Sequence, residues 1–158
     1  MTGQNDTAQG LTVRKASPRE PGAVALLQAS HDYLSALYPP EHNHYLSIDA
    51  LCVPEITFWL ACAAGQATGC VALKRFADYG EVKSMFVSPA ARGSGTGAAL
   101  LGALEAEARA MGLPALRLET GDDLYPAHRL YQRHGFVPCG PFGDYAPGPH
   151  SVFMEKPL

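Results

Sequence analysis

The feature that most constrains the fold is a glycine-rich stretch, SPAARGSGTGAALL, at residues 88–101. It places Gly93, Gly95 and Gly97 within five residues and then continues into an apolar helical pattern. Glycine has no Cβ, so such a loop lets the backbone adopt positive φ and approach a ligand closely. A loop of this kind between a strand and a helix predicts a layered α/β fold with a phosphate-bearing ligand at the helix start.

A nucleoside triphosphate loop would need a lysine and then a serine or threonine after its last glycine, because the lysine reaches the outer phosphates. Here Ala98 follows Gly97. The sequence therefore excludes that class of phosphate loop.

A dinucleotide-binding loop is harder to dismiss, because residues 93–98 satisfy G-x-G-x-x-G/A and Glu119 follows about twenty residues later, where a ribose-binding acid would lie. However, the preceding strand, EVKSMFV, mixes charged and apolar residues, whereas a central parallel strand is nearly all apolar. Residues 89–92 also separate this strand from the first glycine, where a tight turn is expected. The roughly sixty residues after the loop are too few for the rest of a doubly wound domain.

A third interpretation accounts for Arg92, which comes directly before the glycines. Successive backbone N–H groups, a positive helix end and one fixed cation together suit a pyrophosphate. The alternative without a ligand is a tight turn between strand and helix.

The segment from Arg92 to Ala98 resembles the cofactor motif of the GNAT acetyltransferase superfamily, Arg/Gln-x-x-Gly-x-Gly/Ala, through Arg92, Gly95 and Gly97. A later segment, PAHRLYQRHGFVPC at residues 126–139, resembles the family's helix-and-strand signature, in which a tyrosine, here Tyr131, lies four residues before Gly-Phe. The two motifs have the family's order and separation. The resemblance spans residues 55–158 and implies the GNAT fold, a mixed, twisted α/β (α+β) sheet of about six to seven strands with helices on both faces.

Residue patterns along the chain predict the individual elements. We expect a flexible N-terminus at residues 1–10 and a single acetyltransferase domain at 11–158. Hydrophobic patterning and turn residues predict strands at 11–16, 55–65, 70–76, 80–88, 115–120, 136–139 and 150–158, with the turn GQATG joining the second and third. Helix signals predict one helix with Ser17 as N-cap and Pro18 in its first turn, which ends near Leu37, and a short helix at 44–52. A third helix has its apolar residues on one face, namely Leu100, Leu101, Leu104, Ala108 and Met111. A fourth helix runs from a cap at Asp122 or Asp123 to Gly135.

Composition narrows the function classes. The chain has 158 residues, 47% hydrophobic and 17% charged, with a formal net charge of −3 and no basic run, so we expect no nucleic-acid partner. The polar N-terminus is unlike a secretory signal, and there is no apolar run of about 18 residues, so we expect a cytoplasmic protein with no membrane partner. Its four cysteines form no C-x-x-C pair, which indicates reduced thiols.

The resemblance implies acetyl-CoA as co-substrate and no metal. Its pyrophosphate would bind the cation of Arg92 and the N–H groups of Gly93, Ser94, Gly95, Thr96, Gly97 and Ala98. Its pantetheine arm would pair, like an added strand, with the backbone of Met85, Phe86 and Val87.

Acyl transfer to an amine requires a proton acceptor, because an amine with a pKa of about 10 is protonated at neutral pH. The resemblance suggests Glu81 at the start of the cofactor strand, and the alternative is a surface glutamate. Strand alternation predicts that Glu81, Lys83, Met85 and Val87 share one face, where Lys83 could keep Glu81 ionised and weaken it as a base. Tyr131 corresponds to the family tyrosine that protonates the leaving thiolate, and the alternative is a core aromatic.

Two loops, 35–46 and 139–150, are candidates for the acceptor site. Glu41 or Asp144 could neutralise a cationic amine, and Tyr38 or Tyr145 could form a wall; for each the alternative is solvent exposure. His42 and His44 have a metal-like spacing but no third ligand nearby, so we expect no metal there.

These inferences favour an N-acetyltransferase that moves an acetyl group from acetyl-CoA to the amine of a small metabolite or amino acid, by direct attack in a ternary complex. The alternatives are a non-catalytic acyl-CoA-binding or sensing module, a protein-lysine or N-terminal acetyltransferase, and a nucleotide-binding oxidoreductase. A homodimer is expected as a possibility, with the C-terminal strand as its seam.

Overall fold

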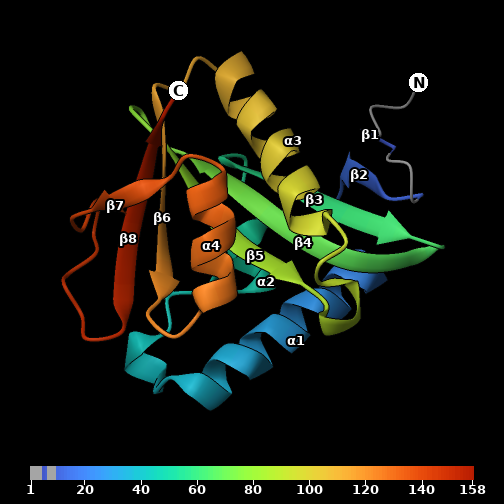
Figure 1. Cartoon of the computed structure of the whole chain (residues 1–158), viewed down its shortest axis with the longest axis horizontal. Coiled ribbons are helices and arrows are strands. Elements are labelled where there is room, and N and C mark those ends of the chain that lie inside the picture. The colour runs from blue at the N-terminus through green and yellow to red at the C-terminus, as the bar shows by residue number, and fades with distance from the viewer. Residues whose placement is uncertain (1–4, 7–9) are drawn as a thin grey trace.

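The structure, a computed structural model, describes residues 5–6 and 10–158 and is built on one mixed sheet with helices on both faces (Figure 1). Its strands are β1 (Asn5–Asp6), β2 (Thr12–Lys15), β3 (Ile56–Ala63), β4 (Gln66–Arg75), β5 (Gly80–Val87), β6 (Ala115–Gly121), β7 (Val137–Cys139) and β8 (Ser151–Pro157). Its α-helices are α1 (Pro21–Leu37), α2 (Ile48–Leu51), α3 (Thr96–Ala110) and α4 (Tyr125–Arg133), and η1 (Pro40–His42) and η2 (Pro89–Ala91) are single 3₁₀ turns. The expected α/β architecture is confirmed: β2 to β8 are the seven expected strands, and the short β1 adds an eighth. The expectation of a flexible N-terminus falls mostly on residues outside the described part.

The strands lie in the order β1-β2-β3-β4-β5-β6-β8-β7. All neighbours are antiparallel except β5 and β6, which are parallel. The C-terminal strand β8 lies inside the sheet, and its residues Phe153–Glu155 pair with β6 on one side and β7 on the other. This stretch therefore offers no free edge for the dimer seam that the sequence suggested, and a homodimer stays a prediction.

Period-two alternation in the central strands fills a separate core on each face of the sheet. Trp59 and Ala61 of β3 join the core under α3, whereas Phe58 and Leu60 join the core under α1. The apolar face predicted for the third helix is confirmed, since Leu100, Leu101, Leu104 and Ala108 are buried in the first core and Met111 packs against it. Helix α1 contributes Ala23, Leu26 and Leu27 to the second core. Strand β5 therefore packs against a hydrophobic core on each of its two faces.

A bulge interrupts β5 at Ser84, which has φ of 55°, a value unusual for a residue other than glycine. The register against β4 shifts at the same place. The extra residue reverses the alternation, so that Lys83 lies beside Glu81 on one face, while Met85 and Val87 pack against the α3 core on the other. The prediction that these four side chains share a face is therefore wrong.

The first helix begins later than predicted. Residues Ser17 to Glu20 form a turn, closed by the Glu20 N–H donating to the Ser17 carbonyl at 3.1 Å. The Glu20 carboxylate accepts hydrogen bonds from both terminal nitrogens of Arg14, at 2.8 and 3.0 Å. Pro21, rather than Pro18, opens the helix, and Glu20 rather than Ser17 is its N-cap residue.

The turn of the β3–β4 hairpin also differs from expectation. The hairpin between β3 and β4 turns at Ala64 and Gly65, which both have positive φ, and β4 starts at Gln66 rather than Cys70. Two consecutive positive φ values define a tight hairpin turn and extend the ladder toward it.

Helix α4 has Leu124 at its N-cap position and no side-chain cap, so neither Asp122 nor Asp123 caps it. The Asp123 N–H instead donates to the Tyr38 hydroxyl at 3.0 Å. The carboxylate of Asp122 lies 3.5 Å from Nδ1 of His150. Both aspartates therefore contact residues far away in the sequence, Tyr38 and His150, instead of capping the helix.

Candidate active site

The candidate site lies where β5 and β6 separate. These parallel strands pair only at Gly80–Leu116 and Glu81–Arg117, and they then diverge (Figure 1). In the described part of the chain, backbone groups of β5 beyond this point have no strand partner on that side. A cavity of about 480 Å³ occupies this region.

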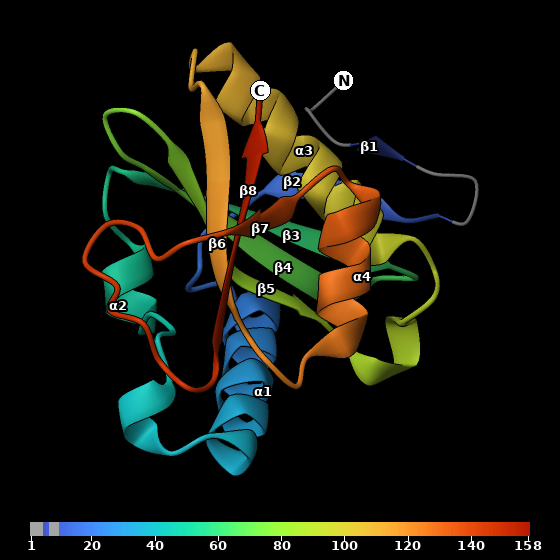
Figure 2. The same cartoon turned by 60° about the vertical axis from the view of Figure 1, so that its left-hand side comes forward.

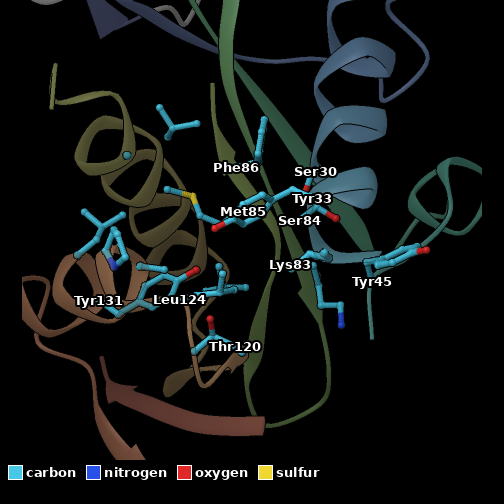
Figure 3. A pocket seen from close by; sticks show the side chains of 18 of the residues that line it. Ser30, Tyr33, Tyr45, Lys83, Ser84, Met85, Phe86, Thr120, Leu124 and Tyr131 are labelled. Atoms are coloured by element: carbon cyan, nitrogen blue, oxygen red, sulfur yellow. The ribbon is translucent and has the colours of Figure 1, made fainter. Parts of the chain in front are cut away.

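The cavity joins segments that are distant in the sequence. Figure 3 shows side chains from α1, β5, β6 and α4 around it. Its lining comes from the end of α1, residues 42–45, β5 from Val82 to Val87, the glycine loop, the end of β6, α4 and His150.

The glycine loop forms one end of the cavity. Gly93 and Gly95 have φ of 79° and 87°, so both positions favour glycine. Gly95 is the N-cap residue of α3, and no side chain among the described residues caps the first N–H groups of the helix. A Cβ on Gly97 would lie 2.8 Å from Cδ2 of Leu130, so a side chain at this position would displace the Leu130 side chain of α4. Unpaired N–H groups at a helix N-terminus attract anions.

The predicted cofactor residues lie together around this end. Those that line the cavity are Met85, Phe86, Val87, Arg92, Gly93, Gly95, Thr96, Gly97 and Ala98. Ser94 does not line it; its hydroxyl contacts the Ala91 carbonyl and the Thr96 hydroxyl. The arrangement fits a diphosphate at the loop and an extended arm along β5.

Tyr131, the predicted proton donor, lines the cavity from α4 and is 5% exposed. Burial raises the pKa of its phenol well above the ordinary value, and the charge of Glu119 adds to this effect. The phenol therefore keeps its proton across the neutral range and can act as a donor.

The carboxylate of Glu81, the predicted base, accepts hydrogen bonds from neighbouring side chains. Its carboxylate accepts a hydrogen bond of 2.6 Å from the Tyr145 hydroxyl and one of 3.3 Å from Nζ of Lys83. Lys83 also donates to the His44 carbonyl and the Tyr145 hydroxyl. The Glu81 side chain is only 6% exposed and does not line the cavity. Its role as base stays a prediction.

A second carboxylate, Glu119, does line the cavity. It accepts a hydrogen bond of 2.8 Å from the Ser151 hydroxyl, and burial raises its pKa. Sequence reasoning considered Glu119 only as a ribose ligand. The alternation of ALRLET could have placed it, because Leu116 and Leu118 occupy the α3 core and Glu119 must therefore face the other side.

The acceptor end is assembled by the segment after α1 and the loop before β8, which lie together in Figure 2. The rings of His42 and His150 are 5.1 Å apart, and those of His44 and Tyr145 are 5.3 Å apart. Tyr38, one of the predicted acceptor residues, lines the cavity and packs on Gly121, where any Cβ would collide with its ring.

The other predicted acceptor residues do not line the cavity: Glu41 and Asp144 are exposed, and Tyr145 contacts Glu81 instead. Sequence reasoning missed the stacked pair of His31 and Tyr45, whose ring centroids are 4.0 Å apart and which line this end. No local motif marks such a pair, because its members come from different segments.

Among residues 5–6 and 10–158, no group of three potential ligands is placed to hold a metal ion. Within the same part of the chain, no helix is long and apolar enough to cross a membrane. The four cysteines are free thiols, and burial raises the pKa of Cys70 to about 12.

Comparison with known proteins assigns the class. The family model described as Acetyltransferase (GNAT) family matches residues 23–136. A protein of Azospirillum brasilense named IAA acetyltransferase is 47% identical over 152 residues, which cover 94% of this chain and 98% of that protein.

Solved structures agree. A Klebsiella pneumoniae protein provisionally described as an acyl-CoA N-acyltransferase has a TM-score of 0.79 at 33% identity, and the match covers 94% of this chain and 97% of that one. The PaiA N-acetyltransferase of Thermoplasma acidophilum, solved with coenzyme A, has a TM-score of 0.72 at 18% identity, covering 94% and 99%, and supports the fold.

The fold and these relatives define an acyltransferase. The chain belongs to the GNAT acetyltransferase family, whose members use acetyl-CoA or CoA.

Proposed function

We propose that this protein is an N-acetyltransferase that transfers the acetyl group of acetyl-CoA to the amine of a small metabolite or amino acid, by direct attack in a ternary complex. The observation that carries the proposal is the continuous cavity. It leads from the uncapped start of α3, along the unpaired part of β5, to the buried phenol of Tyr131 and the half-buried carboxylate of Glu119.

The cofactor end provides the groups that acetyl-CoA requires. Arg92 and the N–H groups of Gly93 to Ala98 would hold the pyrophosphate, because a helix N-terminus and a guanidinium both favour anions. The backbone of Met85 to Val87 would pair with the amides of the pantetheine arm. When bound, acetyl-CoA supplies an activated acetyl thioester.

The reacting end provides proton transfer. A buried carboxylate accepts a proton from the ammonium, and the Tyr131 phenol donates one to the departing sulfur. Glu81 is the carboxylate that the family resemblance suggests. It borders the same region through Lys83, which does line the cavity.

A small acceptor is favoured over a protein chain by the separate segments that meet around the acceptor end. Segments from α1, residues 42–45 and His150 converge there, and Tyr38 packs on Gly121. Pockets of this size bury most of a small molecule.

The test combines two measurements. Calorimetry measures the binding of acetyl-CoA, and a thiol reagent measures CoA release with a panel of amines, amino acids and a lysine-containing peptide. Binding with release that depends on a small amine supports the proposal. Release only with the peptide indicates a protein acetyltransferase, binding without any release indicates a sensing module, and absence of binding overturns the assignment of the loop.

A further inference from the structure

Glu119 lies directly across the gap from Lys83. The last ladder pair between β5 and β6 joins Glu81 to Arg117. Two residues further along each parallel strand are Lys83 and Glu119, which point to the same face as that pair. The strands no longer pair at this level, so the Glu119 carboxylate stands at the opening between them.

The surroundings of Glu119 come from four elements. Lys83 and Glu81 face it from β5, His44 from the segment after η1, Tyr131 from α4 and Ser151 from β8. It thus stands between the phenol at the cofactor end and the lysine and histidine at the acceptor end.

The two carboxylates differ in availability. Glu81 accepts bonds from Tyr145 and Lys83 and is shut off from the cavity. Among the described residues, Glu119 accepts a side-chain hydrogen bond from Ser151 alone, and it opens to the cavity. Burial raises the pKa of Glu119, which brings its basicity closer to what proton abstraction near neutral pH requires.

We infer that Glu119 is the catalytic proton acceptor, that Ser151 positions it, and that Glu81, Lys83 and Tyr145 form a fixed polar wall beside it. This inference rests on the proposed acetyltransferase function. It assigns the base to β6 rather than to the position on β5 that the family resemblance suggested.

The proton balance is as follows. Glu119 accepts one proton from the ammonium of the acceptor and passes it to solvent. The freed nitrogen lone pair forms the bond to the acetyl carbon while the carbon–sulfur bond breaks. Tyr131 donates its proton to the sulfur and regains one from the nitrogen, so that amide, thiol and one solvent proton result.

The variant Glu119→Gln tests the inference, with Glu81→Gln as rival and Glu55→Gln as matched control. Glu55 is exposed in the turn just before β3 and lines no part of the cavity. The probe is the amine from the panel that gives the fastest thiol release with wild type. We expect Glu119→Gln to lower kcat by at least about 100-fold, the usual worth of a general base. Its acetyl-CoA dissociation constant should stay within about twofold of wild type.

The pH profile separates a catalytic role from a structural one. Wild type should lose kcat/KM at low pH as Glu119 becomes protonated, and Glu119→Gln should lack this acid limb. Ser151→Ala removes a hydrogen bond that lowers the pKa of Glu119, so its acid limb should move to higher pH with most of the maximal rate retained. An acid limb that persists in Glu119→Gln, or disappears in Glu81→Gln, overturns the inference.

A readout that needs no acceptor keeps the test decisive if no amine is turned over. In protein labelled with ¹³C at the glutamate carboxyls and saturated with CoA, the resonance absent from Glu119→Gln should titrate above the ordinary glutamate range. Titration within that range overturns the inference. Failure of acetyl-CoA to bind wild type would instead contradict the proposed function, whatever the titration shows.

Discussion

The cofactor side and the acceptor side of the cavity are built in different ways. The cofactor side comes mainly from one continuous segment, from Met85 on β5 through the glycine loop to Ala98 on α3. The acceptor side comes from α1, residues 42–45, the end of β6 and His150, which only the folded chain brings together. The first packs on the larger core, whereas the second combines the ends of one helix and one strand with loop residues, and it includes the exposed rings of Tyr33 and Tyr45.

This difference suits the two tasks. Recognition of a diphosphate and an extended amide-bearing arm needs backbone groups in fixed positions, which a strand, loop and helix start supply. Recognition of an acceptor needs side chains that can be exchanged without disturbing the core, and loops held by a rigid scaffold provide these.

The largest effect expected is on stability. Leu104 of α3 is fully buried in the core beneath the cofactor side. Leu104→Ala should destabilise the protein by about 3 kcal/mol, through lost burial and the cavity it leaves. Tyr45→Ala on the acceptor side, where the ring is 39% exposed, should cost less than about 1 kcal/mol. Denaturant unfolding measures both, and equal losses would contradict the contrast between a rigid and an adaptable side.

Next in size is the effect of Arg92→Ala on the cofactor. Arg92 is exposed and lines the cavity beside the loop. Loss of a charge-assisted contact should weaken acetyl-CoA binding by about tenfold without lowering the unfolding temperature. Arg129→Ala is the control, because Arg129 is exposed on α4 and does not line the cavity. Calorimetry measures the acetyl-CoA dissociation constant of each variant. Equal weakening of acetyl-CoA binding in both variants would indicate a general charge effect.

A smaller effect is expected from Tyr38→Phe. The Tyr38 hydroxyl accepts a hydrogen bond from the Asp123 N–H, and without it this N–H loses its partner, at a cost of about 1 kcal/mol. The wall of the acceptor end should loosen, and KM for the amine should rise about fivefold, with acetyl-CoA affinity unchanged. Isothermal binding and steady-state rates with the same amine measure the two terms. A loss confined to acetyl-CoA affinity would show that Tyr38 acts on the cofactor side of the cavity and not on the acceptor side.

The same contrast explains what the sequence could predict. The positions of the glycine loop, of the helix of Leu100 to Ala108 and of the strands along the chain follow from local periodicity and turn residues, and these positions agree with the structure. The bulge at Ser84 leaves no local signal, because positive φ there depends on pairing with β4. It reversed the expected face of Met85.

The acceptor side shows more clearly which features of the site could not be predicted from the sequence. Exposed Glu41 and Asp144 had suitable chemistry in suitable loops, but neither reaches the cavity. Glu119 was visible in the sequence, but its contact with Ser151 joins residues 32 positions apart. Which polar residues meet in a site depends on tertiary contacts that periodicity does not encode.

The smallest effect expected is a gain in stability in Glu119→Gln. Because burial raises the pKa of Glu119 above the unfolded value of about 4.3, the folded state binds more protons than the unfolded state between the two values. Stability then falls as pH rises through this window, since the charged carboxylate is penalised in the fold. Glutamine removes this penalty, so the variant should unfold at a higher temperature than wild type at pH 7, and the two should converge below about pH 4.

Glu81→Gln gives the matching contrast, because its carboxylate accepts hydrogen bonds from Tyr145 and Lys83 and its loss should destabilise the protein. Thermal unfolding across pH measures both variants. A Glu119→Gln variant that is less stable than wild type at pH 7 would show that Glu119 is a structural carboxylate. A stabilised but inactive variant would show that the fold bears the cost of a buried charge because the reaction uses it.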